Sequence, residues 1–487
     1  MLTIETVNDQ ELKQRIKNKT IDIPRHDQKV VIHDIEPLSL IRSERLDIIA
    51  KYIYAWFIEN KIQSDWGLKL YDEHIRVLNN YEEGDGSGKK GLSNYLSSFH
   101  STLESMKEKG FNSDESLIPI GENRIPLDGA HRIAAALLYD QKVKTVTIKQ
   151  EEPNYNDSFF VDRGLDALES KYCDAIAYEY CKKKPHTHLF ILFPHADFEG
   201  AKKVLEKFGS IIYEKKVLVG NEGPRNLIIQ LYIKNGFLYH SDNAWIEQKI
   251  KDCFIGKGRL RVYLIETQHL YKMNLELMKL HYFKRNMFYV TKDHEKTTEL
   301  AQLFFNENSL HFLNNGRPYQ NASLMKRFYE FKRLISDSSV SNEECYLDNS
   351  TVLAAYGMTA ETNIEVVPRK MDASVFNEHR MSESVLSRCK NANDHCITGD
   401  DILFNPEHHF YFYGLKFASL NVVKKMKLHR RAERDKRDVW KMRRRFFTGN
   451  VLFKWRIAIR PIIQQIKIIV RNIRKSMKSI SGKSFHI

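Results

Sequence analysis

The segment from Ser116 to Ile148 constrains the fold of this chain more than any other stretch. It reads SLIPIGENRIPLDGAHRIAAALLYDQKVKTVTI. The pattern predicts a strand, a tight turn, a second strand, a turn at Asp128–Gly129, a helix that begins at Ala130, and a β-branched strand over 142–148. The helix is short and rich in alanine, so it can pack closely on its neighbours. We therefore expect a unit of mixed helix and strand in the first third of the chain.

The 487 residues are too many for one ordinary hydrophobic core. Hydrophobic residues make up 42% of the chain and aromatic residues 11%, which are values typical of globular proteins. We expect an α/β and α+β multidomain protein without internal repeats. The expected units are an N-terminal domain over 1–150, a central α/β domain over 180–335, a C-terminal domain over 336–450, and a basic amphipathic helical tail over 451–487.

The central domain shows alternating strand and helix patterns. THLFILFP at 187–194 is typical of a buried strand, and DFEGAKKVLEKFG at 197–209 is typical of an amphipathic helix that ends at glycine. Two further segments, SIIYEKKVLV at 210–219 and NLIIQLYI at 226–233, also predict strands.

In the N-terminal domain, apolar residues at helical spacing predict helices over 44–59 and 93–110. Between them, EEGDGSGKKG at 82–91 predicts a flexible loop. It resembles a glycine-rich phosphate loop only loosely, because it lacks the Walker spacing and no strand precedes it.

The positive charge of the chain is concentrated at its C-terminal end. The formal net charge is +14, and the residues from Lys424 onward hold 21 lysines and arginines against three acids. The rest of the chain is mildly acidic, whereas a body that binds duplex DNA usually carries its own basic face. Nucleic acid is therefore the less favoured partner.

The cysteines and the first residues predict a cytoplasmic protein. Six cysteines are scattered without any C-x-x-C spacing, so neither a zinc site nor a disulfide framework is expected. The polar N-terminus lacks an apolar signal region, and no stretch reaches the ~18–20 apolar residues of a membrane span. We expect the protein to be soluble or peripheral.

The turn before the alanine-rich helix is the strongest candidate site. The first N–H groups of a helix are unpaired and its dipole is positive there, so this corner attracts anions. Gly129 lets a ligand approach the backbone closely, and His131 and Arg132 add charge-assisted donors for phosphate. The residues alone leave a second interpretation open, in which Asp128 caps the helix and His131 and Arg132 form a solvated first turn.

The segment PIGENRIPLDGAHRIAAALLYDQKVKTVTI resembles the core of the ParB/sulfiredoxin-like fold, which reads strand, D-G-x-H-R or a variant, alanine-rich helix and strand. The resemblance covers about the first third of the chain and is closest to the ParB-like free serine kinases. It implies that Asp128, Gly129, His131 and Arg132 hold the phosphates of a nucleotide such as ATP, ADP or CTP. It also implies catalytic roles for Asp128 and His131, with Asp128 able to polarise a hydroxyl nucleophile.

This sequence differs from two groups of the family in ways that limit the functions implied by the resemblance. Sulfiredoxins place their reactive cysteine immediately before the His-Arg pair, where this chain has Ala130, so sulfinic acid reduction is excluded. Segregation ParB proteins carry a G-E-R-R-type motif and a helix-turn-helix, and neither is found in this sequence.

A second segment, ECYLDNSTVLAAYGMTAETNIEVV at 344–367, resembles the opening of a nucleotidyltransferase fold. NPEHHFYFYGLKFASLNVVKKMKLHRRAERDKRDV at 405–439 resembles the end of such a domain. That family binds two Mg²⁺ ions on carboxylates, and Asp348 and Glu365 are the matching candidates. Members of that family have a Gly-Ser turn, where this chain has Asp348–Asn349–Ser350. They also have a pair of acidic residues on the following strand, where Asn363 of this chain is neutral and removes one negative charge. We therefore expect a noncatalytic scaffold that keeps the fold.

Several histidines and asparagines have two interpretations. His186 and His188 share one face of a predicted strand, and His408 and His409 adjoin a run of aromatic residues, so each pair fits either a metal site or an ordinary structural role. The asparagines at 306, 308 and 314 are expected to be turn and cap residues.

The last 37 residues have the pattern of a basic amphipathic helix. Apolar residues recur at steps of three or four, lysines and arginines lie between them, and Pro461 is expected to start the second of two helical segments. This pattern favours an anionic membrane surface over docking on the body or a nucleic-acid arm. The expected membrane-binding residues are Trp455, Ile459, Ile466, Lys467, Arg471, Ile473 and Arg474.

Together these features predict a bacterial cytoplasmic protein that is peripheral at the inner face of the cytoplasmic membrane. The leading hypothesis is a nucleotide-dependent phosphotransferase that acts with Mg²⁺ on a sugar, polyol or similar hydroxyl acceptor. Its expected setting is surface polysaccharide or lipid-linked glycan assembly, an association rather than a chemical deduction. The alternative is a noncatalytic nucleotide-binding regulatory protein or a ParB-like nucleic-acid-associated protein.

Overall fold

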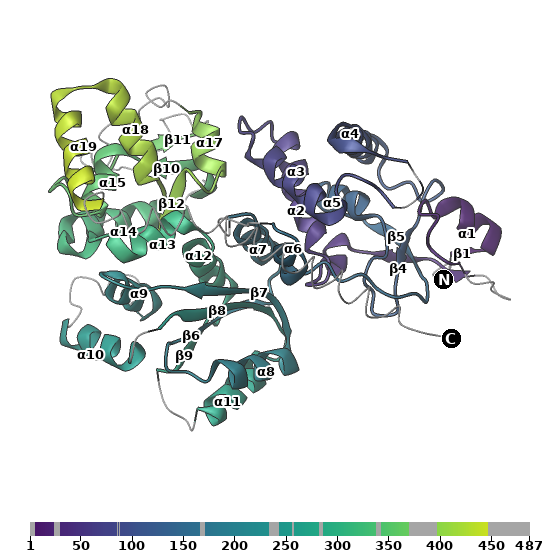
Figure 1. Cartoon of the computed structure of the whole chain (residues 1–487), viewed down its shortest axis with the longest axis horizontal. Helices are drawn as coiled ribbons and strands as arrows, with labels where there is room; N and C mark the ends of the chain where they lie inside the picture. The colour runs from purple at the N-terminus through teal and green to yellow at the C-terminus, as the bar shows by residue number, and fades with distance from the viewer. Residues whose placement is uncertain are drawn as a thin grey trace, which may run out of the picture.

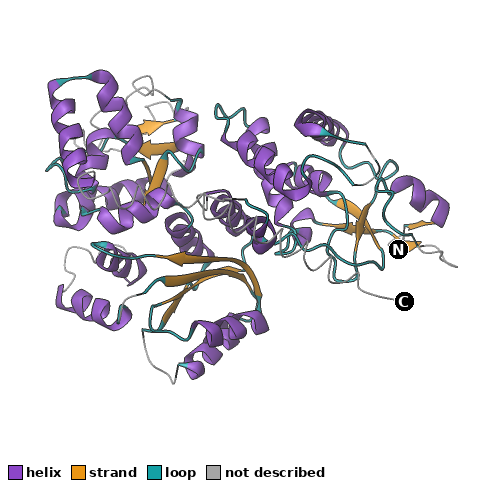
Figure 2. Ribbon diagram, in the orientation of Figure 1, coloured by secondary structure: helices purple, strands orange, loops and turns teal. Residues whose placement is uncertain are grey.

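The computed structural model combines small sheets with many helices (Figures 1 and 2), so the expected mixed α/β class is confirmed. None of its described helices is long and apolar enough to cross a membrane. The predicted tail over 451–487, with all its membrane-binding candidates, lies outside the described residues. The structure describes residues 5–23, 30–84, 86, 88–165, 171–232, 243–255, 258–281, 286–337, 342–369 and 397–446.

The N-terminal region is built on a three-stranded sheet in the order β3–β5–β4. The central strand β5 (Val143–Thr147) pairs antiparallel with β3 (His33–Ile35) and parallel with β4 (Ile118–Ile120). Helix α5 (Ala130–Leu138) connects β4 to β5, as the sequence predicts. The smaller elements of this region are β1 (Thr6–Val7), α1 (Asp9–Arg15), β2 (Val30–Val31), η1 (Pro37–Leu40) and α6 (Asp157–Asp162).

Three long helices accompany α5: α2 (Leu46–Glu59), α3 (Trp66–Asn79) and α4 (Gly91–Lys109). Helices α2 and α4 both pack on α5, and α3 packs on α2. The helices predicted over 44–59 and 93–110 are therefore present. Gly110 ends α4 with a φ of 75°, a conformation that glycine adopts readily.

The central region holds an antiparallel sheet in the order β7–β8–β6–β9. Its strands are β6 (Thr187–Leu192), β7 (Ser210–Val217), β8 (Leu260–Glu266) and β9 (Phe288–Val290). One face packs on α8 (Phe198–Phe208) and α11 (Leu270–Leu280). The other face packs on α7 (Lys171–Lys183), α9 (Gly223–Tyr232), α10 (Asn243–Cys253), α12 (His294–Phe304) and α13 (Glu307–Asn315).

The strand predicted over 226–233 is wrong, because this segment belongs to helix α9. Asn226 and Gln230 are one helical turn apart, and Gln230 Nε2 lies 3.4 Å from the carbonyl oxygen of Asn226. The amide of Asn226 donates to the carbonyls of Leu313 and Gly316 at 2.7 and 3.0 Å. A short apolar run does not distinguish a strand from a buried helix, and these partners near the end of α13 come from far along the chain.

The C-terminal region has a sheet in the order β11–β10–β13–β12. Strand β10 (Cys345–Leu347) is antiparallel to β11 (Val366–Pro368) and parallel to β13 (Leu415–Ala418), which forms a hairpin with β12 (His409–Phe412). The helices of this region are α14 (Ala322–Asp337), α15 (Asn349–Ala355), α17 (Gly399–Phe404), α18 (Leu420–Arg430) and α19 (Glu433–Phe446). Short 3-10 turns lie at η3 (Pro318–Gln320) and η4 (Asn342–Glu344).

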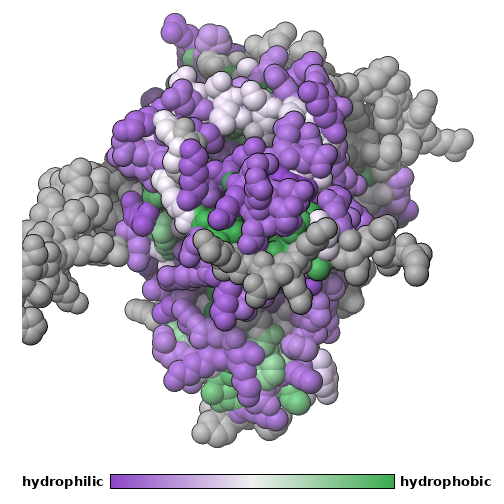
Figure 3. All heavy atoms as spheres, turned by 90° about the vertical axis from the view of Figure 1, so that its right-hand side faces the viewer, coloured by the Kyte–Doolittle hydropathy of each residue, from purple (hydrophilic) through white to green (hydrophobic). Residues whose placement is uncertain are grey.

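The three regions meet at the centre of the molecule (Figure 1). One hydrophobic cluster joins the N-terminal and central regions, and helix α2 packs on α7. The loop after α2 contacts the C-terminal region, where Gln63 N–H donates to Asp400 and the hydroxyl of Thr398 donates to the Gln63 carbonyl. Viewed from the N-terminal side, the described surface is mostly hydrophilic, with small apolar areas (Figure 3).

Candidate functional site

The start of helix α5, which we call the corner and which comprises Asp128, Gly129, His131 and Arg132, has the geometry of an anion-binding site. Gly129 is its N-cap residue and lies in the left-handed region with a φ of 86°. A Cβ at this position would lie 2.5 Å from Ile118 Cδ1, so glycine is required there. No side chain of the described residues caps this helix. Among the residues that the structure describes, the first N–H groups of α5 therefore have no side-chain capping partner.

Asp128 does not cap the helix but forms an ion pair with Arg132, at 3.0 Å between Oδ2 and Nη2. The other terminal nitrogen of Arg132 donates to the Leu117 carbonyl at 3.2 Å. The Asp128 and Arg132 side chains are 26% and 18% exposed, so both reach the surface in part. This pair holds the guanidinium in place beside the corner.

The side chain of Tyr71 in helix α3 contacts His131 and positions its ring. Nε2 of His131 lies 2.9 Å from the Tyr71 hydroxyl, and the imidazole ring packs edge-on against Phe99. Burial, with Lys51 and Lys89 nearby, lowers the pKa of His131 well below its usual value, so the imidazole is neutral. Burial also raises the pKa of Tyr71, which keeps its proton. Of the two predicted donors, only Arg132 therefore carries a charge.

The hydrogen bond to Tyr71 engages Nε2 of His131 and leaves Nδ1 as the other ring nitrogen. Within the described residues the Tyr71 hydroxyl has no other partner, and as both donor and acceptor it fits either neutral tautomer of the ring. In the tautomer with its proton on Nδ1, His131 offers an N–H donor despite its neutrality.

A buried polar cluster that the sequence analysis missed lies behind this corner. Arg45, at the start of α2, donates to both carboxylate oxygens of Asp47 at 2.8 and 2.9 Å and to the carbonyl of Pro126. Lys51 Nζ lies 3.1 Å from Asp47 and 3.2 Å from Nε2 of His74. The sequence contained a signal for this cluster, because the charged residues Asp47 and Lys51, one helical turn apart, interrupt an otherwise apolar helix.

The charges of this cluster leave an excess of positive charge in the interior. Burial raises the pKa of Asp47, but Arg45 and Lys51 outweigh that effect and hold it below its usual value. Burial is the main cause that lowers the pKa of His74 well below its usual value, and the charge of Lys51 lowers it further, so this ring is neutral. Two cations therefore face one carboxylate in a part of the protein that excludes water.

The described part of the glycine-rich segment over 82–91, which leaves out residues 85 and 87, lies near the same corner. The N–H of Glu83 donates to the Lys89 carbonyl at 3.1 Å, and the N–H of Gly91 donates to the Tyr81 carbonyl at 3.0 Å. Lys89 is close enough to His131 to lower its pKa. The structure therefore brings together two segments that the sequence analysis treated separately.

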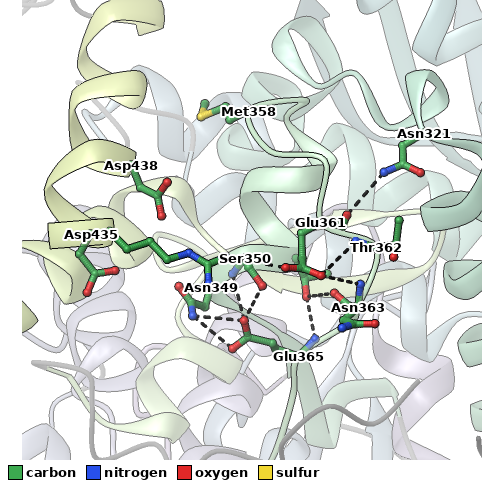
Figure 4. Close-up of polar contacts among 12 residues, drawn as sticks. Asn321, Asn349, Ser350, Met358, Glu361, Thr362, Asn363, Glu365, Asp435 and Asp438 are labelled. Carbon is green, nitrogen blue, oxygen red and sulfur yellow. Dashed lines mark hydrogen bonds and ion pairs between the residues drawn. The ribbon is translucent and has the colours of Figure 1, made fainter. Parts of the chain in front are cut away.

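The second candidate site lies between β10 and β11 in the C-terminal region (Figure 4). The carboxylate of Glu365 accepts hydrogen bonds from the Asn349 amide at 3.2 Å, from the Ser350 N–H at 3.4 Å and from the Ser350 hydroxyl. The N–H of Asp348 donates to the Glu365 carbonyl at 2.9 Å. Asp348 and Glu365 are thus neighbours, but Glu365 serves as a cap for helix α15.

The remaining acids of this site are also engaged. Lys427 is buried and lies 2.9 Å from both Asp435 and Asp438. Asn363 accepts from Arg327 at 3.0 Å. No group of three or more metal-binding side chains occurs in the described part of the chain. The carboxylate of Glu365 is engaged in capping, and no metal-dependent step is assigned to this site.

Three of the other ambiguous residues have structural partners. His188 Nδ1 lies 3.1 Å from the Thr291 carbonyl, and His409 Nδ1 lies 2.8 Å from the Ile402 carbonyl. Asn306 caps α13 by accepting from the Ser309 N–H at 2.8 Å. The predicted cap role is confirmed for Asn306.

No protein-family model matches this chain, and no curated protein or solved structure shows significant similarity to it.

Proposed function

We propose that this chain is a nucleotide-dependent phosphotransferase whose phosphate site is the start of α5. The observation that carries the proposal is the uncapped start of this helix, formed at Gly129 and flanked by Arg132. Free N–H groups, a helix dipole and a guanidinium together form a site suited to phosphate. The buried cations Arg45 and Lys51 add positive potential from behind.

Each residue of the corner has a role in this proposal. The proposal places the proton of the neutral His131 ring on Nδ1, with Nε2 accepting from the Tyr71 hydroxyl. Arg132 and this Nδ1–H donate to phosphate oxygens, and Lys89 approaches from the glycine-rich loop. Phosphoryl transfer needs mainly positioning and charge neutralisation, which these donors supply. Mg²⁺ bound to the nucleotide would neutralise further phosphate charge.

The acceptor is a hydroxyl group of a sugar, polyol or similar compound. Its oxygen attacks the terminal phosphorus of the nucleotide, and the bond from that phosphorus to the bridging oxygen breaks. The hydroxyl proton passes to Asp128, the carboxylate at this corner, whose side chain is partly exposed. A lipid-linked glycan at the inner face of the membrane is the proposed natural acceptor, on the basis of the tail sequence alone.

The second candidate function is nucleotide binding without turnover, in a regulatory protein. The Asp128–Arg132 ion pair favours it, because Asp128 must leave this pair before it can accept a proton. A binding protein would need the same corner but no free base.

The test is a thermal-shift screen with ATP, ADP and CTP in the presence of Mg²⁺. A ligand that binds only the folded chain stabilises it by about 2.7 kcal/mol at a hundredfold excess over Kd. We expect Arg132→Ala to remove this stabilisation, and Lys142→Ala, an exposed charge near β5, to keep it. Nucleotide stabilisation that persists in Arg132→Ala would overturn the proposal.

Turnover separates the two candidate functions. Phosphorus NMR of the nucleotide, incubated with the full chain and a panel of sugars and polyols, would show a new phosphomonoester for a phosphotransferase. Binding without any acceptor-dependent product would favour the regulatory protein.

A further inference from the structure

A cavity of about 330 Å³ lies where the three regions meet, away from both sites described above. Elements from all three regions line it, namely α2 and α3, α7 and α12, and η4, α17 and β12. Ring contacts hold this junction together, for example Trp56 of α2 against Phe404 of α17 at 5.3 Å. The volume is at the lower end of the range for small-molecule sites, about 300–1,000 Å³.

One wall of the cavity is aromatic. Trp56, Phe57, Trp66, Phe305 and Phe404 line it. The indole N–H of Trp66 has no hydrogen-bond partner among the described residues, although the side chain is only 3% exposed. Buried indole N–H groups usually have a partner. A bound molecule that accepts this hydrogen bond would supply one.

The cavity lining also includes a carboxylate that its neighbours keep ionised. Glu343 is 27% exposed and has the fully buried ammonium of Lys416 against it. The Tyr178 hydroxyl donates to it at 3.1 Å, and the Tyr411 hydroxyl lies 3.3 and 3.4 Å from its two oxygens. Burial raises the pKa of Glu343, but Lys416 and Lys182 outweigh that effect and lower it to about 2. The cavity wall therefore offers an ionised hydrogen-bond acceptor beside aromatic rings.

Two further groups of the cavity lining have hydrogen-bonding capacity to spare. The His409 ring donates from Nδ1 to Ile402, and burial lowers its pKa to about 3, so its Nε2 is an acceptor without a partner in the described residues. Lys182 is 35% exposed and bonds to Glu179 at 3.0 Å, which leaves ammonium protons for a ligand. The lining thus combines acceptors with a donor.

The charged groups around the cavity have partners of opposite charge. Glu179 pairs with Lys182 and Glu343 with Lys416. Glu344 lies 3.7 Å from Arg369, which also pairs with Asp400 at 2.7 Å. A charged ligand would leave an uncompensated charge in a largely apolar space, which is costly. The cavity therefore favours a neutral molecule with both donors and acceptors.

We propose that this cavity binds a neutral planar heterocycle of the guanine type, in which N–H donors adjoin a carbonyl acceptor. The N–H edge donates to Glu343, the carbonyl accepts from Lys182, and the ring packs on the aromatic wall. Such a ligand contacts all three regions and stabilises their arrangement. This inference does not rest on the proposed phosphate site, which lies at the other end of α2.

The experiment uses the full chain and three nucleosides, with the fluorescence of Trp56 and Trp66 as the signal of binding. We expect guanosine to quench the fluorescence and raise Tm. Inosine lacks the exocyclic amine and is expected to bind about tenfold more weakly than guanosine. Adenosine, in which the hydrogen-bond donors and acceptors of this edge of the base are exchanged, is expected to bind more weakly still. Absence of quenching by guanosine, or equal affinity for guanosine and adenosine, would overturn the proposal.

Two variants test whether guanosine binds in this cavity. Lys182→Met removes the donor, and Ala175→Leu places a larger side chain in the cavity that Ala175 lines. Each is expected to weaken guanosine binding at least tenfold with an unchanged circular dichroism spectrum, whereas Lys203→Met on the exposed side of α8 leaves it unchanged. If one variant fails to fold, the other decides. Guanosine binding that neither variant alters would overturn the assignment to this cavity, and Arg132→Ala should bind guanosine normally.

Discussion

The hydroxyl of Tyr71 lies 2.9 Å from Nε2 of His131, so a residue 60 positions earlier in the chain fixes the imidazole at the candidate phosphate site. A second pair of the same kind lies beside it, since the Tyr54 hydroxyl is 2.8 Å from Nε2 of His100 and the Tyr54 ring stacks on Tyr71. His100 belongs to α4 and does not lie at the start of α5. The two pairs therefore offer a test and its control.

Tyr71→Phe is expected to weaken nucleotide binding about tenfold while the chain remains folded. The change removes the hydroxyl that orients the His131 ring and that, in the proposal, donates to Nε2 and keeps the proton on Nδ1. Loss of one buried hydrogen bond costs about 1 kcal/mol of stability. Tyr54→Phe should have a similar cost but no effect on nucleotide affinity, measured by calorimetric titration. Equal loss of affinity in both variants would show that Tyr71 acts only through packing.

Gly129→Ala is expected to lower stability by more than about 1 kcal/mol and to remove nucleotide-dependent stabilisation. The added Cβ would approach Ile118 Cδ1 to 2.5 Å, and the backbone has a φ of 86°. Gly84→Ala is the matched control, because nothing lies within 4 Å of its Cβ and its φ lies outside the left-handed region. Thermal unfolding with and without nucleotide gives both quantities. A Gly129→Ala chain with normal stability would contradict the described turn.

Asp348→Ala and Glu365→Ala are expected to affect stability rather than any magnesium-dependent property. Glu365 caps α15 through Asn349 and Ser350, and leaving these donors unpaired costs about 1–3 kcal/mol. Millimolar Mg²⁺ should leave Tm unchanged in the wild type. Glu330→Ala on the exposed side of α14 should be neutral. Stabilisation by Mg²⁺ that disappears in both variants would show that the acids form a working metal site.

Stability is expected to fall as the pH is lowered from 7 to 5, in part through His409. Burial holds the pKa of His409 at about 3, whereas in the unfolded chain it titrates near 6.5. Between these values the unfolded state binds more protons, so acid favours unfolding, and this residue alone contributes about 2 kcal/mol between pH 7 and pH 5. Urea unfolding of His409→Gln should show a shallower pH dependence, and the exposed His33→Gln should match the wild type. The same slope in all three chains would refute the role of His409.

Local sequence signals predicted the elements that depend on neighbours in the chain. Gly110 marks the end of α4, and Asp128–Gly129 marks the start of α5. The pairing of Lys51 with His74 depends on how α2 packs on α3, which periodicity does not contain. The same holds for Glu343 and Lys416, which lie on different elements of the C-terminal region. Charged residues inside an apolar pattern were the available signal, but their partners come only from the fold.

Membrane binding by the predicted tail would depend on a different balance of forces from nucleic-acid binding, and the effect of salt distinguishes the two. Each Lys or Arg near an anionic bilayer contributes about 1 kcal/mol, which salt screens, whereas burial of the isoleucine face persists at high salt. Liposome co-sedimentation should therefore weaken but remain at high salt, and Ile466→Asp with Ile473→Asp should abolish it. Gln464→Asp with Gln465→Asp adds the same charge outside the isoleucine pattern and should retain most of the binding. Duplex binding would instead fall steeply with salt and tolerate the isoleucine changes, because phosphate contacts dominate it. Tight duplex binding that ignores both isoleucine substitutions would refute the membrane prediction and favour the nucleic-acid alternative.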